Sequence, residues 1–371
     1  MVNSMFLKKV AINNFMSLRH VEVDLSKINV LIGPNATGKS NFIRALHFLS
    51  LLGYGDLSWV LQSMGFKSFS DIVYGQVSPL EVSLSLEVEG DDGSYFYGIC
   101  LHNGRVVKEE LKFNDVILVS RIDPYKARYL TARGDVVIDT CSTGRLAIFS
   151  LGNVHERVKS FAKYVRSWSF YSFNPEAITL ENTVAYSRRL SRDGGNLAQV
   201  LHTLLTAHRR EFKMVEYLMK ACIPSIEEVL TPPSTEQGKI YVAIRERGFD
   251  KYFSFNQISN GTLRLLAFIT ALSLDSQLIG FEEPENCIHP HLLETLMDVI
   301  EKSGKQVIIT THSPHLLDHV ELESILLVRK VDGETRIKKL SQSEQVEYVR
   351  KFLLEGGTLG EAWYSGVMHR G

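Results

Sequence analysis

One eight-residue motif constrains this chain more than any other feature of its sequence. Residues 33–40 read Gly-Pro-Asn-Ala-Thr-Gly-Lys-Ser, which fits the pattern G-x-x-x-x-G-K-[ST]. The apolar segment 27–32 precedes the motif, and apolar residues at helical spacing follow it over 41–52. A strand, a glycine-rich turn and a helix in this order bring backbone N–H groups and a helix N-terminus together. The motif therefore predicts a phosphate-binding loop, the alternative being an ordinary glycine-rich turn.

The residue types of this loop suit a nucleotide with a bound cation. The Lys39 ammonium is expected to reach the β- and γ-phosphates, and the Ser40 hydroxyl is expected to bind Mg²⁺. The loop residues Gly33, Pro34, Asn35, Ala36, Thr37 and Gly38 would present their backbone to the phosphates.

A second pattern places two adjacent carboxylates at the end of a strand. The apolar segment 278–281 leads directly into Glu282 and Glu283, the arrangement called Walker B. Glu282 would hold the Mg²⁺ shell, and Glu283 would act as a general base on the attacking water. The position of Glu282 is usually Asp, so its longer side chain would use a different rotamer or a bridging water. The alternative is an exposed strand end with two solvated acids.

Two further turns carry polar residues next to apolar segments. His312 follows the predicted strand 306–311, and we expect it to contact the γ-phosphate and the attacking water. A capping or surface histidine is the alternative. Ser259, Asn260 and Gly261 precede a predicted helix, which makes a second anion-binding turn. The alternative for this turn is a simple helix N-cap.

The pattern of apolar residues predicts an α/β fold. Strands are predicted near the N-terminus and through a strand-rich region, followed by helices and then by alternating strands and helices typical of a parallel sheet. The predicted strands cover 6–12, 20–25, 27–32, about 80–150, 239–247, 277–281 and 306–311, and the helices cover 41–52, 154–170, 196–223, 263–274 and 290–301.

The predicted elements and motifs together define one nucleotide-binding head. Lys39 and Glu283 must meet at one Mg²⁺, so both ends of the chain are expected to build the same head. Its parts are an N-terminal lobe at 1–155 with a mixed β-sheet, a helical insertion at 156–236 and a C-terminal parallel-sheet lobe at 237–371.

Composition excludes several classes of protein. The 371 residues include 41 Lys+Arg and 42 Asp+Glu, with 44% hydrophobic residues, which excludes a disordered chain and a polybasic tail. The longest apolar run, 265–274, is too short to span a bilayer, and no secretory signal begins the sequence. Four cysteines without a CxxC pair fit a reducing cytoplasm. We therefore expect a cytoplasmic protein without a membrane partner.

Because the net charge of the chain is close to zero, any DNA binding would depend on local basic clusters. One cluster contains Arg188, Arg189 and Arg192, and a second covers 208–213. Either could contact phosphates, whereas a solvated helix face is the alternative.

These motifs, with NFMSL near the start and GFEEPENCIHP and IITTHSPHLLD near the end, resemble the RecF/SMC-like branch of ABC-type ATPases. More narrowly, the chain resembles stand-alone AAA_21 ATPases, which are related to the ATPase part of OLD-family nucleases. The resemblance covers essentially the whole chain. It implies an ABC-type P-loop ATPase head that binds ATP and Mg²⁺, and it adds Asn41 to the phosphate-binding residues.

The resemblance also implies a homodimer that sandwiches two ATP molecules. Ser259, Asn260 and Gly261 would then act in trans on the ATP of the other subunit. Glu285 and Asn286 would lie in a loop that contacts the partner, and the turn at 14–19 would approach the adenine and ribose. Gln76 is the candidate for the glutamine that many ABC-type ATPases use to bind the metal.

Two family features are missing from the sequence, and two functions remain open. The sequence has no long coiled coil with a CxxC hook, and 59 residues after His312 are too few for a Toprim nuclease domain. We expect a Mg²⁺-dependent ATPase in DNA repair or in defence against mobile elements, with any effector on a separate chain. The alternative is an ATP-gated scaffold that controls a partner nuclease or toxin with little turnover.

Overall fold

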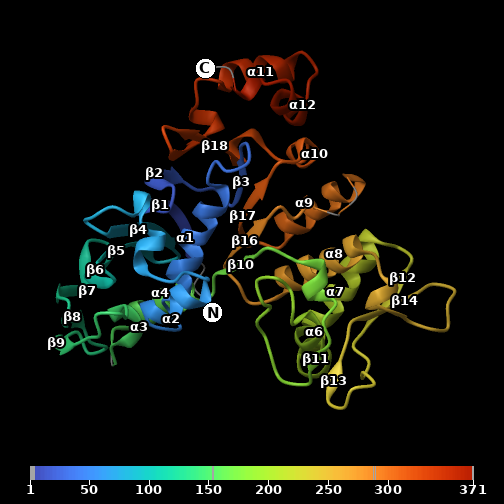
Figure 1. Ribbon diagram of the computed structural model, residues 1–371, viewed down its shortest axis with the longest axis horizontal. Helices are drawn as coiled ribbons and strands as arrows, with labels where there is room; N and C mark the ends of the chain where they lie inside the picture. The colour runs from blue at the N-terminus through green and yellow to red at the C-terminus, as the bar shows by residue number, and fades with distance from the viewer. Residues whose placement is uncertain (1–4, 153, 287, 289, 370–371) are drawn as a thin grey trace. The chain divides into compact units, whose positions relative to one another are not determined.

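The contacts within the chain divide it into two units. The first contains Met1–Trp168 and Glu323–Ser343, and the second contains Ser169–Leu322 and Glu344–Gly371. The structure is a computed structural model that describes residues 5–152, 154–286, 288 and 290–369 (Figure 1). The boundary at Trp168 leaves the helix before it in the first unit, whereas the sequence predicted a lobe boundary near residue 155.

The first unit is built on an antiparallel sheet of eight strands in the order β2-β1-β4-β5-β6-β7-β8-β9 (Figure 1). Buried and more exposed residues alternate along most of these strands, so that one face is buried, whereas all five residues of β9 are exposed. In β4, for example, Val82, Leu84 and Leu86 are buried, while the residues between them are more exposed. The strands are β1 (Met5–Phe15), β2 (Leu18–Asp24), β4 (Glu81–Gly90), β5 (Gly93–His102), β6 (Arg105–Phe113), β7 (Val116–Asp123), β8 (Lys126–Leu130) and β9 (Val136–Thr140).

A second group of strands in this unit includes the one that leads into the phosphate loop. β3 (Ile28–Ile32) pairs in parallel with β18 (Ile325–Val331), which pairs antiparallel with β19 (Glu334–Lys339). Val30, Leu31 and Ile32 are completely buried, as expected for a strand covered on both faces. The helices of the unit are α1 (Lys39–Leu51), α2 (Leu57–Ser63), α3 (Ala147–Ser150) and α4 (Glu156–Arg166).

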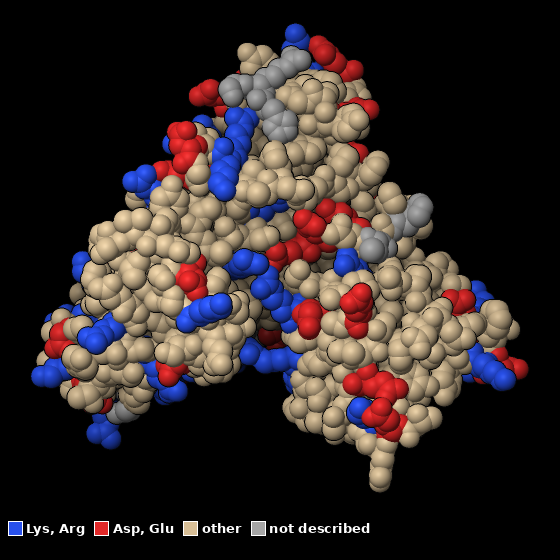
Figure 2. All heavy atoms as spheres, viewed as in Figure 1, with Lys and Arg blue, Asp and Glu red and all other residues tan. Residues whose placement is uncertain are grey.

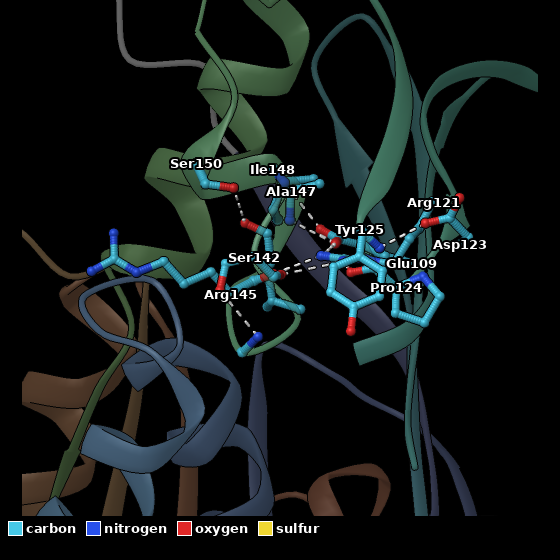
Figure 3. A network of polar contacts seen from close by, with 12 residues as sticks. Glu109, Arg121, Asp123, Pro124, Tyr125, Ser142, Arg145, Ala147, Ile148 and Ser150 are labelled. Carbon is cyan, nitrogen blue, oxygen red and sulfur yellow. Dashed lines mark hydrogen bonds and ion pairs between the residues drawn. The ribbon is translucent and has the colours of Figure 1, made fainter. Parts of the chain in front are cut away.

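A buried ion pair joins the antiparallel sheet to α3 (Figure 3). The side chains of Glu109 and Arg121 have no exposed surface, and their closest N···O distance is 3.3 Å. The Glu109 carboxylate also accepts hydrogen bonds from the backbone N–H groups of Ala147 at 2.6 Å and Ile148 at 3.0 Å. A buried charge is tolerated only with such partners. Glu109 therefore fixes the start of α3 to the sheet.

The second unit contains a three-stranded parallel arrangement of β10 (Ser169–Tyr171), β16 (Leu278–Glu282) and β17 (Gln306–Thr311). Its longer helices are α6 (Leu197–Ala207), α7 (Arg209–Cys222), α8 (Asn260–Ser273) and α9 (Leu293–Lys302). The shorter ones are α5 (Pro175–Ile178), α10 (Pro314–Leu317), α11 (Val346–Leu354) and α12 (Leu359–Tyr364). Two small sheets complete the unit, formed by β11 (Asn182–Thr183) with β13 (Lys239–Ile240), and by β12 (Ile226–Leu230), β14 (Ala243–Glu246) and β15 (Phe253–Ser254).

Strand β10 is the main difference from the predicted elements. The sequence predicted one helix over 154–170, but α4 ends at Arg166, and the chain becomes extended at Ser169. The reason is pairing with a distant strand, since Tyr171 lies opposite Phe281 in parallel register. Phe170 packs so closely on Gly280 that a Cβ there would lie 2.4 Å from its ring. The predicted strand 239–247 is likewise divided into β13 and β14.

No helix in the described ranges combines the length and the apolar character needed to cross a membrane. On the face shown in Figure 2, basic and acidic side chains are interspersed over a mostly uncharged surface. This distribution matches the nearly equal numbers of basic and acidic residues in the sequence.

Candidate nucleotide site

The phosphate loop has the strand–turn–helix geometry that the motif predicted. β3 ends at Ile32, and α1 begins at Lys39. Between them, Ala36 and Gly38 adopt left-handed backbone conformations, with φ of 61° and 105°. Pro34, Asn35 and Ala36 are exposed, so their backbone is accessible to a ligand. The loop therefore presents N–H groups and the first turn of a 13-residue helix to one point.

Lys39 folds back over its own loop. Its Nζ donates hydrogen bonds to the carbonyl oxygens of Gly33 at 2.6 Å and Pro34 at 3.0 Å, and the residue is only 6% exposed. A phosphate oxygen would be a stronger, charged acceptor for the same ammonium. The side chain is thus held at the loop, where the sequence predicted that it would act.

A cluster of polar side chains supports the loop through hydrogen bonds. Its central member, Thr335, was not predicted from the sequence. Thr335 Oγ1 donates to the carbonyl oxygen of Thr37 at 2.7 Å and lies 2.7 Å from Ser17 Oγ. Ser17 Oγ accepts a hydrogen bond from Asn41 Nδ2 at 2.8 Å. A Cβ on Gly38 would lie 2.0 Å from Thr335 Oγ1, so this contact requires glycine. We call Ser17, Asn41 and Thr335 the loop brace.

The turn at 14–19, predicted to approach adenine and ribose, joins β1 to β2. Asn14 and Met16 have positive φ of 57° and 51°, which makes the turn tight. Arg19 forms an ion pair with Glu334 at 2.6 Å, and its guanidinium lies 5.6 Å from the centre of the Tyr74 ring. This turn contributes Ser17 to the loop brace, while its role toward a nucleotide remains a prediction.

Gln76 lies in a short 3₁₀ turn, Tyr74–Gln76, and has a positive φ of 53°. Its side chain is exposed. Gln76 belongs to the first unit, as does Ser40, whereas Glu282 belongs to the second. The proposed metal role of Gln76 therefore remains a prediction.

In the second unit, strand β16 ends at Glu282, and the next residue has an unusual conformation. Glu283 has a φ of 47°, and its N–H donates to the carbonyl oxygen of Thr310 at 2.9 Å. A left-handed conformation at a residue other than glycine costs about 1–3 kcal/mol and often occurs at functional sites. Here it directs the Glu283 side chain away from the path of the strand.

The Glu283 carboxylate is held by two neighbours. Its Oε1 lies 3.1 Å from His312 Nε2, and its Oε2 accepts a hydrogen bond from Asn286 Nδ2 at 2.7 Å. Both Glu283 and His312 remain partly exposed, at 39% and 33% of their side chains. The structure thus brings together two residues that the sequence assigned to catalysis from separate motifs.

Glu285 links the loop after β16 to the end of β17. One of its oxygens accepts hydrogen bonds from Thr311 Oγ1 at 2.5 Å and from the His312 N–H at 3.1 Å. Asn286 is exposed, and its carbonyl oxygen accepts a hydrogen bond from Arg264 at 2.8 Å. These contacts fix the loop that was predicted to face a partner subunit, and the partner contact itself remains a prediction.

Ser259 caps the N-terminus of α8. Its hydroxyl accepts a hydrogen bond from the Thr262 N–H at 3.1 Å, the geometry of an N-cap. Ser259 and Asn260 are exposed, and Gly261 is half-buried. Capping leaves the other N–H groups of the first turn available, so it does not conflict with a role in trans.

Two arginines of the predicted basic cluster are ion-paired within the second unit. Arg192 pairs with Glu282, and Arg188 pairs with Asp275 at 2.9 Å. The first pair could not be predicted from the sequence, because no motif links residues 192 and 282. These contacts reduce the charge that the cluster could offer to DNA.

The available donors suit a hard divalent cation. In the second unit Glu282 carries carboxylate oxygens, which Mg²⁺ prefers, and in the first unit Ser40 carries a hydroxyl oxygen. Among the residues that the structure describes, no group of three or more His, Cys, Asp or Glu side chains could hold a metal by itself. Mg²⁺ commonly uses one or two carboxylates together with phosphate oxygens and water, so the Glu282 carboxylate suits it, and the joint use of Glu282 with Ser40 remains a prediction.

The chain is similar to known proteins in sequence and in fold. The family model described as "AAA domain, putative AbiEii toxin, Type IV TA system" (AAA_21) matches residues 28–318. This range runs from the strand before the phosphate loop to the helix after His312.

Two groups of curated proteins are similar to the chain. The Old nuclease of Escherichia phage P2 is 23% identical over 93% of this chain, and the OLD nuclease of Thermus scotoductus is 21% identical over 93%. The DNA replication and repair protein RecF of Lactobacillus acidophilus is 33% identical over 23% of the chain. The chain spans 62% of the length of the phage P2 protein and 23% of that of RecF.

Solved structures of SMC heads share the fold. The SmcHead bound to the C-winged helix domain of ScpA aligns with 92% of the chain at a TM-score of 0.59 and 12% identity, covering 99% of that structure. The Smc head domain with an extended coiled coil, bound to the C-terminal domain of ScpA derived from Pyrococcus furiosus, gives a TM-score of 0.57 and 11% identity over 95% of the chain, again with 99% of that structure covered. The predicted ABC-type ATPase head is therefore confirmed as a fold.

Proposed function

The chain belongs to the AAA_21 family, a RecF/SMC-like group of ABC-type ATPases related to OLD proteins, and on this basis we propose that it is a Mg²⁺-dependent ATPase. The observation that carries the proposal is the contact between Glu283 and His312, 3.1 Å apart at the ends of two adjacent parallel strands. This contact supports ATP hydrolysis rather than ATP binding alone, because it already orients the proposed general base and its partner.

In this proposal each part of the chain has one task. The phosphate loop and Lys39 bind the triphosphate, and Ser40 and Glu282 would hold Mg²⁺, which neutralises phosphate charge. Glu283 accepts the proton of the attacking water, and Asn286 keeps its carboxylate in place. His312 orients the same water and contacts the γ-phosphate.

We further propose that two chains form a dimer around ATP. The exposed start of α8, with Ser259 and Asn260, would bind the γ-phosphate held by the other chain. The exposed Asn286 loop would lie at the same interface. The SMC heads that share this fold support the proposal through the fold alone.

The biological role follows from the relatives and is also a proposal. RecF is named for DNA replication and repair, the OLD relatives are named as nucleases, and the family description refers to a toxin–antitoxin system. These names support a role in DNA maintenance or in defence against mobile elements, with a nuclease or toxin as the effector.

ATP hydrolysis by purified variants tests the proposal. Lys39→Ala should abolish ATP binding, and Glu283→Gln should bind ATP but hydrolyse it at least about a hundredfold more slowly. In saturating Mg²⁺-ATP, the Glu283→Gln variant should have twice the monomer mass by light scattering. The exposed Lys302 and Glu301 provide the matched controls Lys302→Ala and Glu301→Gln.

Two results would contradict the proposal separately. Unchanged hydrolysis in Lys39→Ala would exclude the phosphate loop as the site. A Glu283→Gln variant that binds ATP but stays monomeric would exclude the dimer while leaving the ATPase intact.

A further inference from the structure

Arg192 lies in a well-defined turn of the second unit. The segment 187–196 precedes α6 and is closed by internal hydrogen bonds. The Ser191 N–H donates to Asn196 Oδ1 at 2.7 Å, and Asn196 Nδ2 donates to the carbonyl oxygen of Arg189 at 2.8 Å. The Gly195 N–H donates to Asp193 Oδ1 at 3.0 Å. Because both ends of the turn are tied, the backbone of Arg192 has a fixed position.

The same turn is attached to the chain that leaves β10. The Ser172 N–H donates to the carbonyl oxygen of Arg192 at 2.8 Å, and the Asn174 N–H donates to that of Asp193 at 2.9 Å. β10 pairs in parallel with β16, with Tyr171 opposite Phe281. The residue after Tyr171 is therefore level with Glu282, and the turn is anchored beside the acidic strand end.

The Arg192 side chain uses this position to pair with Glu282. The Glu282 side chain is only 12% exposed, and that of Arg192 is 32% exposed. Arg192 Nη2 donates to Glu282 Oε1, whereas its Nε is buried without a hydrogen-bond partner in the described part of the chain. One carboxylate oxygen that would serve Mg²⁺ is thus already occupied by a positive charge from the same chain.

We propose that Arg192 is an internal counter-ion that holds Glu282 until Mg²⁺ binds and displaces it. This inference rests on the proposed function, since it assigns Glu282 to the Mg²⁺ shell. A guanidinium and a divalent cation compete for the same oxygen, so the ion pair raises the Mg²⁺ concentration that the site requires.

Arg188 provides a matched control in the same segment. It pairs with Asp275, whose side chain is 84% exposed, and lies 3.6 Å from Glu211. Neither acid belongs to the candidate site. Arg188→Gln therefore removes the same charge from the same segment without releasing Glu282.

The test is a Mg²⁺ titration of the binding of a fluorescent, non-hydrolysable ATP analogue. Arg192→Gln should lower the Mg²⁺ concentration for half-maximal binding by roughly fivefold to thirtyfold, as expected for a partly buried ion pair. Arg188→Gln should leave it unchanged.

Each outcome decides one point. If the unmodified chain does not bind the analogue at any Mg²⁺ concentration, the proposed function fails, and this inference fails with it. If the unmodified chain binds but Arg192→Gln requires the same or more Mg²⁺, Arg192 is not a competitor, and only the inference is overturned. An equal shift in Arg188→Gln would also overturn it, because the effect would then reflect general charge.

Discussion

Replacing Thr335 with valine should weaken the phosphate loop, although Thr335 is not itself among the residues predicted to contact the nucleotide. Thr335 is 1% exposed, and valine has nearly the same shape. The change removes the hydroxyl that donates to the Thr37 carbonyl oxygen and pairs with Ser17 Oγ, both at 2.7 Å. Leaving a buried polar group without its partner costs about 1–3 kcal/mol. With two groups affected, we expect a loss of about 2–4 kcal/mol in the free energy of unfolding.

Part of this cost should appear as weaker ATP binding, because the carbonyl of Thr37 belongs to the loop itself. The fluorescent ATP analogue should bind Thr335→Val at least about tenfold more weakly, which corresponds to about 1.4 kcal/mol. Urea unfolding followed by circular dichroism measures the stability change. Thr335→Ser keeps the hydroxyl and should bind the analogue like the unmodified chain.

A double-mutant cycle with Ser17→Ala separates the two hydrogen bonds. Because Ser17 and Thr335 share one of them, their effects on stability should not add. The interpretation would be refuted if Thr335→Val bound ATP normally, or if Thr335→Ser were as impaired as Thr335→Val.

The remaining predictions concern buried charges. Arg121→Met should lower the free energy of unfolding by about 3–5 kcal/mol in urea titrations, since it leaves the carboxylate of Glu109 buried without its charge partner. The exposed pair of Lys8 and Glu89 is the control, and Lys8→Met should unfold like the unmodified chain. Burial lowers the pKa of Lys305 to about 8, so the unfolded chain binds more protons between pH 8 and its ordinary value of 10.5. Relative to Lys305→Met, stability should therefore rise across this pH range, and a flat difference would contradict the lowered pKa.

Local sequence was sufficient to predict the structure wherever a motif and its flanking strand or helix are contiguous in the chain. The phosphate loop follows directly from an apolar strand, a glycine-rich turn and a helix, and the structure contains all three in order. The ends of β16 and β17 were also predicted, because each carries a short apolar run that stops at a polar residue. The contact between Glu283 and His312 then follows, since parallel neighbours end at the same edge.

Local sequence failed where a distant partner decides the structure. Residues 169–171 continue the apolar spacing of α4, and only pairing with β16 makes them a strand. Thr335 lies in an ordinary hairpin, and nothing near it indicates contact with Thr37. Arg192 was assigned to a basic cluster because its neighbours are arginines, whereas its position next to Glu282 depends on the fold.

The loop brace has a consequence for how the chain is made. Ser17 and Thr335 are separated by 318 positions in the sequence, yet both contact the phosphate loop or its helix. During synthesis from the N-terminus, the loop at 33–40 leaves the ribosome long before Thr335 exists. A nascent chain therefore carries an unsupported loop until Thr335 has been made. The loop brace is completed only when the hairpin of β18 and β19 has emerged, so a supported phosphate loop forms after the segments between residues 40 and 325 have been made.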